Sequence, residues 1–297
     1  MGTLTRKEFD LLNAMLGAKE KLSQRKLEEL TGYSLSTVNR TARDLAAKGL
    51  LQNGSVTAKG LEAMEPYAAK RAVFVAAGFG SRMVPVTLNT PKPLVRVNGK
   101  RIIDGLLDAC LAAGIEEIYI VRGYLAEQFD QLLYKYPMIH FLENPAYNDA
   151  NNISSAVCAR YLLQNAYVFE ADLVISNPKI VTKYHYSSDF LGIYMDRSDD
   201  WCFTVKNGII TEQKVGGLNV YQEVGISYWD GEAGRKLADD LKTTYEMPGG
   251  KERYWDQVPF SFFPEHYQVE IRPCLQSDII EIDSFKELKA IDKTYDV

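Results

Sequence analysis

The sequence predicts a small helical unit that carries a β-hairpin, followed by a larger α/β domain with a mainly parallel central sheet. Apolar residues recur at helical spacing through the N-terminal region, and an Asn-Gly pair follows them. The pattern changes at Pro66, because residues 72–77 form a continuous apolar run, which is typical of a strand buried in a parallel sheet. Helical and strand segments then alternate, as in α/β domains. We therefore expect one domain over residues 1–67 and a second over residues 71–297.

The N-terminal unit shows helix starts and a tight turn in a regular order. Thr5 and Glu8 have the spacing of a capping box, in which each side chain bonds the backbone of the other residue. Ser23 and Ser34 precede the next two amphipathic segments, as helix N-caps do. The Asn-Gly pair at residues 53–54 suits the positive φ angles of a two-residue hairpin turn. Three helices and a hairpin predict a winged helix-turn-helix domain.

The second region alternates in the way that a βαβ arrangement requires. Its apolar periodicity predicts helices over residues 102–111, 125–134 and 153–163, and strands over residues 118–121 and 167–170. Successive parallel strands joined by helices place their carboxyl ends at one edge of the sheet, where α/β domains bind ligands.

The composition is that of a globular protein, with 46% apolar and 25% charged residues among 297. No apolar run approaches the roughly 18 residues of a membrane span, and the N-terminus contains no signal-peptide core, so we expect a cytoplasmic protein. The four cysteines form no CxxC pair and only three histidines are present, which excludes a zinc-type cluster. The net charge of −5 divides into +3 over residues 1–70 and −8 over the remainder.

The most specific motif combines two glycines with two cations directly after the first buried strand. Gly78 and Gly80 let backbone amides approach a bound anion closely. Arg82 offers a fork of donors for phosphate oxygens, and Lys92 is a point charge held between two prolines. The combination indicates a phosphate-binding loop, although Gly-x-Gly lacks the spacing of a dinucleotide-binding fold.

Residues 72–124 resemble the N-terminal half of the nucleotidyltransferases that activate sugar phosphates and phosphocholine, which share this loop and a Pro-Lys-x-Leu element. The resemblance implies a Rossmann-like nucleotidyltransferase domain. It also implies a loop that cradles the nucleotide triphosphate, formed by Ala77, Gly78, Gly80, Ser81 and Arg82. Lys92 would contact the phosphate under attack, Arg82 would hold the β- and γ-phosphates, and Tyr124 would lie near the base.

The second half resembles the bacterial CTP:phosphocholine cytidylyltransferases over nearly all of residues 72–293. The motifs that carry the resemblance occur in order at residues 144–147, 151–152, 170–172, 200–201, 224–230, 254–256 and 281–284. CTP and phosphocholine are the substrates that it implies. Leu173 replaces a polar residue of the family pattern, and residues 214–222 match nothing in it. Asn152 is assigned to the nucleotide, with helix capping as the alternative for it or for Asn151.

Carboxylates near these motifs suggest a Mg²⁺ site. Asp172 follows a buried strand at its carboxyl end. Glu281 and Asp283 are two residues apart in a predicted strand, so both should point to one face while Ile282 points to the core. Mg²⁺ takes one or two carboxylates together with phosphate oxygens and water. We expect Asp172 and Asp283 to hold the metal and Glu281 to contact the acceptor.

Aromatic residues beside acids suggest how a choline headgroup would be held. A quaternary ammonium donates no hydrogen bond, so proteins bind it with aromatic faces and carboxylates. Trp201 follows Asp200, and Trp255 precedes Asp256. We expect Trp201, Trp255 and Asp256 to contact the acceptor, although an aromatic residue is more often part of a core.

Two rival functions remain open. The same machinery could act on a sugar 1-phosphate, phosphoethanolamine or an aminophosphonate, and the chain could instead be a regulator that only senses a nucleotide or a choline compound. The second predicted helix of the helix-turn-helix would present Ser36, Thr37, Asn39 and Arg40 to DNA. The balance of +3 is modest, and the hairpin carries no Lys or Arg. We predict weak DNA binding, with regulation or docking as the alternative.

Overall fold

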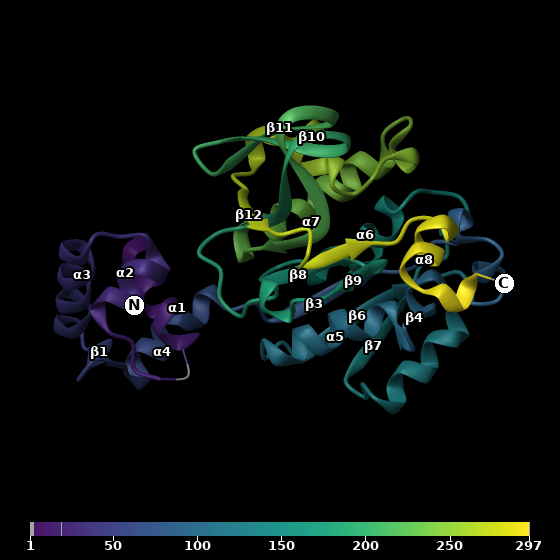
Figure 1. Cartoon of the computed structure of the whole chain (residues 1–297). Coiled ribbons are helices and arrows are strands. Elements are labelled where there is room, and N and C mark those ends of the chain that lie inside the picture. The colour runs from purple at the N-terminus through teal and green to yellow at the C-terminus, as the bar shows by residue number, and fades with distance from the viewer. Residues whose placement is uncertain (1–2, 19, 297) are drawn as a thin grey trace. The chain divides into compact units, whose positions relative to one another are not determined.

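The computed structural model describes residues 3–18 and 20–296, and it divides into two compact units. The first unit is Met1–Ala68 and the second is Ala69–Val297 (Figure 1). The division falls between the two domain ranges that the sequence predicts. Each unit has its own core and is described separately below.

The N-terminal unit is the predicted winged helix-turn-helix. Its elements are α1 (Arg6–Leu16), α2 (Gln24–Thr31), α3 (Leu35–Ala47), β1 (Leu51–Gln52), β2 (Ser55–Val56) and α4 (Ala58–Met64). The capping box of Thr5 and Glu8 is present, and Ser34 caps α3. Asn53 and Gly54 both have positive φ, 51° and 73°, as the hairpin turn requires.

A lysine outside the hairpin reaches its tip. The ammonium of Lys21 donates to the carbonyl of Asn53 at 2.6 Å. A Cβ at Gly54 would lie 2.6 Å from Lys21 Cε, so the glycine leaves room for this side chain. The wing therefore carries a cation that its own strands lack, because the chain before α2 folds against the turn.

The second unit is built on a seven-stranded sheet in the order β10-β12-β11-β8-β3-β6-β7. The strands are β3 (Arg71–Val75), β6 (Glu117–Arg122), β7 (Ile139–Glu143), β8 (Ala166–Glu170), β10 (Asp189–Lys206), β11 (Ile209–Trp229) and β12 (Glu270–Cys274). Strands β8, β3, β6 and β7 are parallel, and β11 joins β8 in the antiparallel sense. The predicted α/β class is confirmed.

Helices cover both faces of this sheet (Figure 1). Alternate residues of β3 explain the arrangement: Phe74 packs in the core beneath α5 (Ile102–Ala112), and Val73 packs in the core beneath α6 (Ile153–Ala159) and α7 (Gly231–Glu246). The segment expected as a helix over residues 125–134 is instead a 3₁₀ helix, Ala126–Tyr134. Smaller elements close the domain: β4 (Arg96–Val97), β5 (Lys100–Arg101), β9 (Leu173–Ile175), β13 (Ile279–Glu281) and α8 (Phe285–Ile291).

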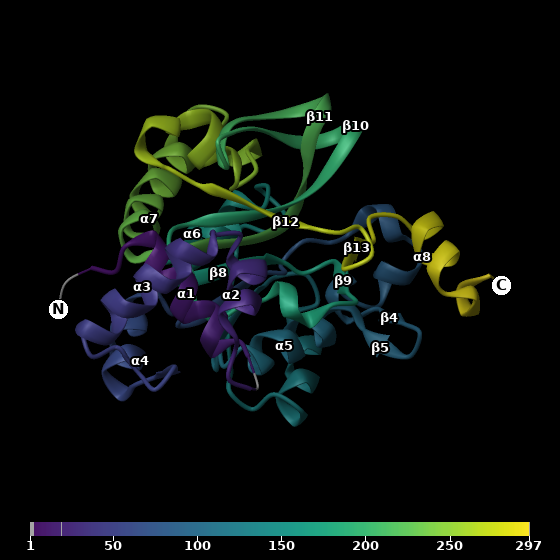
Figure 2. The ribbon, with the colours of Figure 1, turned by 60° about the vertical axis from the view of Figure 1, so that its left-hand side comes forward.

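A long antiparallel ribbon of β10 and β11 is the main element that the sequence does not predict (Figure 2). Its two strands contain 18 and 21 residues. They are joined at Asn207 and Gly208, whose φ angles of 52° and 79° again form a tight turn. The segment 214–222, which matches no family motif, lies in β11.

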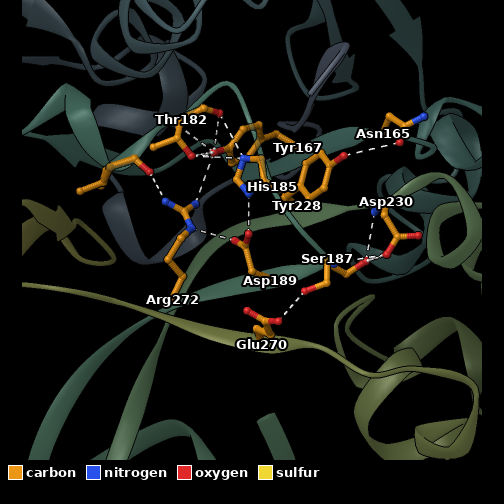
Figure 3. A network of polar contacts seen from close by, with 12 residues as sticks. Asn165, Tyr167, Thr182, His185, Ser187, Asp189, Tyr228, Asp230, Glu270 and Arg272 are labelled. Atoms are coloured by element: carbon orange, nitrogen blue, oxygen red, sulfur yellow. Dashed lines mark hydrogen bonds and ion pairs between the residues drawn. The ribbon is translucent and has the colours of Figure 1, made fainter. Parts of the chain in front are cut away.

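A buried polar network joins the amino end of β10 to β12 (Figure 3). Asp189 accepts hydrogen bonds from the guanidinium of Arg272, at 2.8 Å, and contacts the ring of His185. Tyr228 stacks on that ring with a centroid distance of 4.0 Å. Burial alone would raise the pKa of Asp189, but the cationic Arg272 and the His185 contact hold it at about 2. The network lies at the end of β8 away from Glu170, so it stabilises the sheet rather than the ligand edge.

Candidate active site

A cavity of about 530 Å³ lies at the carboxyl ends of β3 and β8. This is the edge at which parallel α/β sheets bind ligands. Its lining comes from four places in the fold: the loop after β3, the loop before α6, the end of β8, and the ribbon with the segments that follow it. Sequence segments that are distant in the chain therefore meet around one space.

The loop after β3 forms one end of the cavity. The predicted phosphate-loop residues all line it: Ala77, Gly78, Gly80, Ser81 and Arg82. A Cβ at Gly78 would meet no other atom within 4 Å, so that position is open to a ligand. Gly80 has a φ of 68°, and a Cβ there would lie 3.1 Å from Lys92 Cβ. Its glycine therefore allows both the turn and the close packing of the loop on Lys92.

Lys92 is buried and lies between two of the predicted acids. Its ammonium donates to Asp172 Oδ2 at 2.6 Å and to Asp283 Oδ1 at 3.0 Å. Burial alone would lower the pKa of Lys92, but these two carboxylates raise it above its ordinary value. Arg82 also reaches Asp283 Oδ1, at 2.7 Å, while 69% of its side chain stays exposed. Both predicted cations therefore line the cavity, and Lys92 keeps its charge at neutral pH.

Three carboxylates approach one another closely enough to share a cation. Oxygen atoms of Glu170, Asp172 and Glu281 all lie within 4.8 Å of one another. Asp172 Oδ1 is buried and accepts no hydrogen bond within the described part of the chain. Enclosure by the protein and the charges of Asp172 and Asp283 raise the pKa of Glu281 to about 8, and burial and neighbouring acids raise that of Glu170. A hard divalent cation would relieve this repulsion, so the residues fit Mg²⁺.

The position of Glu170 depends on a glycine in the neighbouring strand. A Cβ at Gly225 of β11 would lie 2.7 Å from the Cβ, Cγ and Oε2 atoms of Glu170. Asn152 holds the same carboxylate from the other side, with its amide nitrogen 3.3 Å from Glu170 Oε1. The side chain of Asn152, the N-cap residue of α6, makes no capping bond, so the side-chain capping role is wrong for Asn152. It lines the cavity, as Asn151 does.

Aromatic residues also line the cavity: Tyr147, and the pair Trp201 and Tyr254, which we call its aromatic end. The rings of Trp201 and Tyr254 meet edge to face at 6.1 Å with an interplanar angle of 69°. Asp200 accepts from the backbone N–H of Trp201 at 2.7 Å. An aromatic face with carboxylates beside it suits a cationic group.

The chain matches known families over both units. Residues 71–193 match the nucleotidyl transferase family and residues 3–58 match the MarR family. A 2-aminoethylphosphonate cytidylyltransferase of Lancefieldella rimae is 37% identical over 228 residues, which are 75% of this chain and 92% of that protein. A choline-phosphate cytidylyltransferase of Streptococcus pneumoniae is 30% identical, over 75% of this chain and 97% of that protein.

Solved structures agree with these matches. The CTP:phosphocholine cytidylyltransferase of Streptococcus pneumoniae superposes with a TM-score of 0.71 at 28% identity, covering 76% of this chain and 99% of that one. The chain belongs to the cytidylyltransferases of the nucleotidyltransferase family. It carries a MarR-type winged helix at its N-terminus. Among residues 3–18 and 20–296, no helix is long and apolar enough to cross a membrane.

Two predicted contact residues of the enzyme do not line the cavity. Trp255 is 1% exposed and packs against Phe190 and Trp229 in the core, so its assignment to the acceptor is wrong. The ribbon covers this position, and the sequence does not predict the ribbon. Tyr124 lies outside the lining, and its hydroxyl donates to the carbonyls of Thr87 and Leu88, so its position near the base stays a prediction. It braces the phosphate loop from behind.

The other predicted site residues lie together around the cavity. Lys92, Asn152, Asp172, Trp201, Asp256, Glu281 and Asp283 all line the cavity. Asp283 Oδ1 already accepts from Lys92 and Arg82, so Glu170 and Glu281 complete the acidic set around Asp172. The metal pair of Asp172 and Asp283 stays a prediction.

Sequence reasoning found Asp256 but missed the acid and the amide beside it, Glu223 and Gln213. Glu223 of β11 lines the cavity, and Gln213 links it to Asp256. No motif marks Glu223. Its signal is a single acid at the start of the apolar segment 224–229, which is an unusual position for a charge in a strand that is largely buried.

Proposed function

We propose that the enzyme transfers the cytidylyl group of CTP to a phosphate or phosphonate oxygen of a small acceptor that carries a cationic amine. The acceptor oxygen attacks the α-phosphorus, the new P–O bond forms, and the bond to the β-phosphate breaks with release of pyrophosphate. Phosphocholine is the acceptor that the sequence resemblance implies, and CDP-choline would then be the product. The nucleophile is already an anion, so alignment and charge neutralisation carry the reaction.

The mixed lining of the cavity is the observation that carries this proposal. The loop after β3 presents backbone amides with Arg82, and Lys92 lies beside it, which suits phosphates. The same cavity presents Trp201 and Tyr254 together with carboxylates, which suits a positive headgroup and gives a sugar hydroxyl little advantage. A zwitterionic acceptor would thus span the cavity with its anion toward Lys92.

The chain's own residues divide the work. Lys92 would hold the α-phosphate and its attacking oxygen together, and Arg82 would hold the β- and γ-phosphates. Asp172 and Asp283 would hold Mg²⁺, with Glu170 and Glu281 beside them. A bound Mg²⁺ would neutralise phosphate charge. Lys92 must then turn its ammonium from Asp172 toward the phosphate.

A second acceptor, 2-aminoethylphosphonate, has its own support. The relative from Lancefieldella rimae, named for that substrate, is 37% identical to this chain. Pyrophosphate release with CTP, Mg²⁺ and a panel of phosphocholine, phosphoethanolamine, 2-aminoethylphosphonate and glucose 1-phosphate tests the proposal. Turnover with the amines and little with the sugar is expected, with CTP preferred over ATP, GTP and UTP. Good turnover with the sugar alone would contradict the proposal.

Trp201→Ala should weaken the binding of the acceptor far more than the binding of CTP. A cation–π contact contributes about 0.5–2 kcal/mol, so KM for the amine acceptor should rise from a few-fold to about thirty-fold. Initial rates with each substrate varied in turn measure the effect. Tyr134→Ala is the control, because that ring is 96% exposed and lies outside the cavity. Equal rises in KM for CTP and acceptor would instead indicate a packing role for Trp201.

Removal of residues 1–66 should leave cytidylyl transfer largely intact. Every cavity residue lies in the second unit, which has its own core. We propose weak DNA binding by the winged helix, with regulation or docking as the alternative, because residues 1–70 carry a net charge of only +3. A fluorescence titration of the full chain against DNA from upstream of its gene measures this. Nanomolar, salt-sensitive and sequence-specific binding to DNA would overturn the expectation of weak binding. Loss of cytidylyl transfer in the truncated enzyme would show that the N-terminal unit supports the active site.

A further inference from the structure

Two carboxylates behind the aromatic end of the cavity are tied together by one neutral amide. Gln213 Nε2 donates to Glu223 Oε2 at 2.8 Å and to Asp256 Oδ2 at 2.6 Å. Both acids line the cavity, while Gln213 is 8% exposed and lies behind them. The amide therefore holds the two carboxyl groups side by side at the cavity. They also contact each other, and Asp256 accepts from the backbone N–H groups of Asp256 and Gln257.

These acids lack a cationic partner. Within the described parts of the chain, no lysine, arginine or histidine forms an ion pair with Glu223 or Asp256, and their shared side-chain donor is the uncharged Gln213. Lys92 is engaged by Asp172 and Asp283. Burial raises the pKa of both acids, and the contact with Asp256 raises that of Glu223 further. A cationic ligand would offset this cost of charging the pair.

Carboxylates outnumber aromatic side chains in the lining of the cavity. Among the described residues, three aromatic ones line it, Tyr147, Trp201 and Tyr254, against seven acidic residues. Tyr228, Trp229 and Trp255 are buried in the cores. The end of the cavity thus offers more hydrogen-bond acceptors than ring faces, which is the opposite of a cage for a quaternary amine.

We propose that Glu223 and Asp256 bind the N–H groups of the acceptor's ammonium, so that the enzyme selects a primary amine over a trimethylated one. This inference rests on the proposed cytidylyl transfer. A primary ammonium has three donors and can bond both carboxylates at once, whereas a trimethylammonium has none and is larger. A site built to accept hydrogen bonds rejects an analogue that cannot donate them, because its buried acceptors are then left unpaired.

A methylation series of one acceptor tests the selection. We expect kcat/KM to fall stepwise from phosphoethanolamine through its N-methyl and N,N-dimethyl forms to phosphocholine, by at least about tenfold overall. Glu223→Gln should raise KM for phosphoethanolamine by about tenfold and leave KM for CTP unchanged. It should also reduce the ratio of kcat/KM for phosphoethanolamine to kcat/KM for phosphocholine. Glu212 is an exposed acid of the same strand outside the cavity, so Glu212→Gln is the matched control. It should leave both KM values and the preference for the primary amine unchanged.

The outcomes separate this inference from the function on which it rests. Comparable kcat/KM along the series, or faster turnover of phosphocholine, would overturn the primary-amine selection and leave cytidylyl transfer standing. Absence of transfer to every amine acceptor would remove the proposed function itself. Should Glu223→Gln fail to fold, judged by its thermal melt, Asp256→Asn replaces it in the same series. An unchanged preference in a folded variant would also contradict the assignment.

Discussion

Lys92→Met should lower kcat by about a hundredfold while the protein stays folded. The ammonium lies within hydrogen-bond distance of Asp172 and Asp283 beside the phosphate loop, so it is placed to meet charge that shifts at the α-phosphate. Removing one electrostatic contact of this kind typically costs on the order of 10²–10³ in rate. Methionine keeps the length and apolar volume of the side chain, and therefore removes the charge with little change in packing. Steady-state kinetics at saturating CTP measure kcat directly.

The pH dependence sharpens the same test. The two carboxylates raise the pKa of Lys92, so its charge persists through neutral pH and is lost only as the pH rises through that raised value. The loss of rate should therefore be constant between pH 6 and 8. Lys179→Met is the control, since Lys179 is exposed and outside the cavity. A near-normal kcat in Lys92→Met would show that the phosphate site is misplaced.

The phosphate loop could be predicted because its chemistry is local in the sequence. Sixteen residues, 77–92, contain all the parts of a phosphate site: glycines after a buried strand, an arginine, and a lysine between prolines. Asp172 was found in the same way, from its position directly after an apolar strand. The role of such a residue follows from the strand that it ends. The sequence pattern predicts that strand without any knowledge of tertiary contacts.

The acceptor end could be predicted only in part, because it depends on the long ribbon. An aromatic residue beside an acid suggests a solvent-facing pair, which holds for Trp201 and fails for Trp255. Adjacent residues point in different directions here: Tyr254 and Asp256 face the cavity, and Trp255 packs beneath the ribbon. Glu223 lies between the unmatched segment 214–222 and the motif at 224–230, so only its pairing in three dimensions reveals it.

Arg272→Met should be the most destabilising single change in the catalytic unit outside its apolar core. It removes the cation that faces Asp189 in the buried network of Figure 3. Breaking one partner of a buried pair costs about 3–5 kcal/mol, and we expect roughly 3 because His185 still contacts Asp189. For a unit of this size that lowers Tm by about 6–12 °C. Differential scanning calorimetry measures it, with the exposed Arg235→Met as the control.

A pH series and a double variant decide whether loss of the charge pair between Arg272 and Asp189 causes the destabilisation. The pKa of Asp189 is held at about 2, below its ordinary 3.8, so its contribution to the free energy of unfolding is present above pH 3.8 and is lost as the pH falls toward 2. The stability gap between the wild type and Arg272→Met should therefore be constant from pH 7 to about 4 and narrow below it. Adding Asp189→Asn should recover part of the loss, because the uncompensated carboxylate is gone. A gap that is independent of pH, together with additive losses in the double variant, would mean that Arg272 stabilises the sheet through packing and its bond to the Ile180 carbonyl instead.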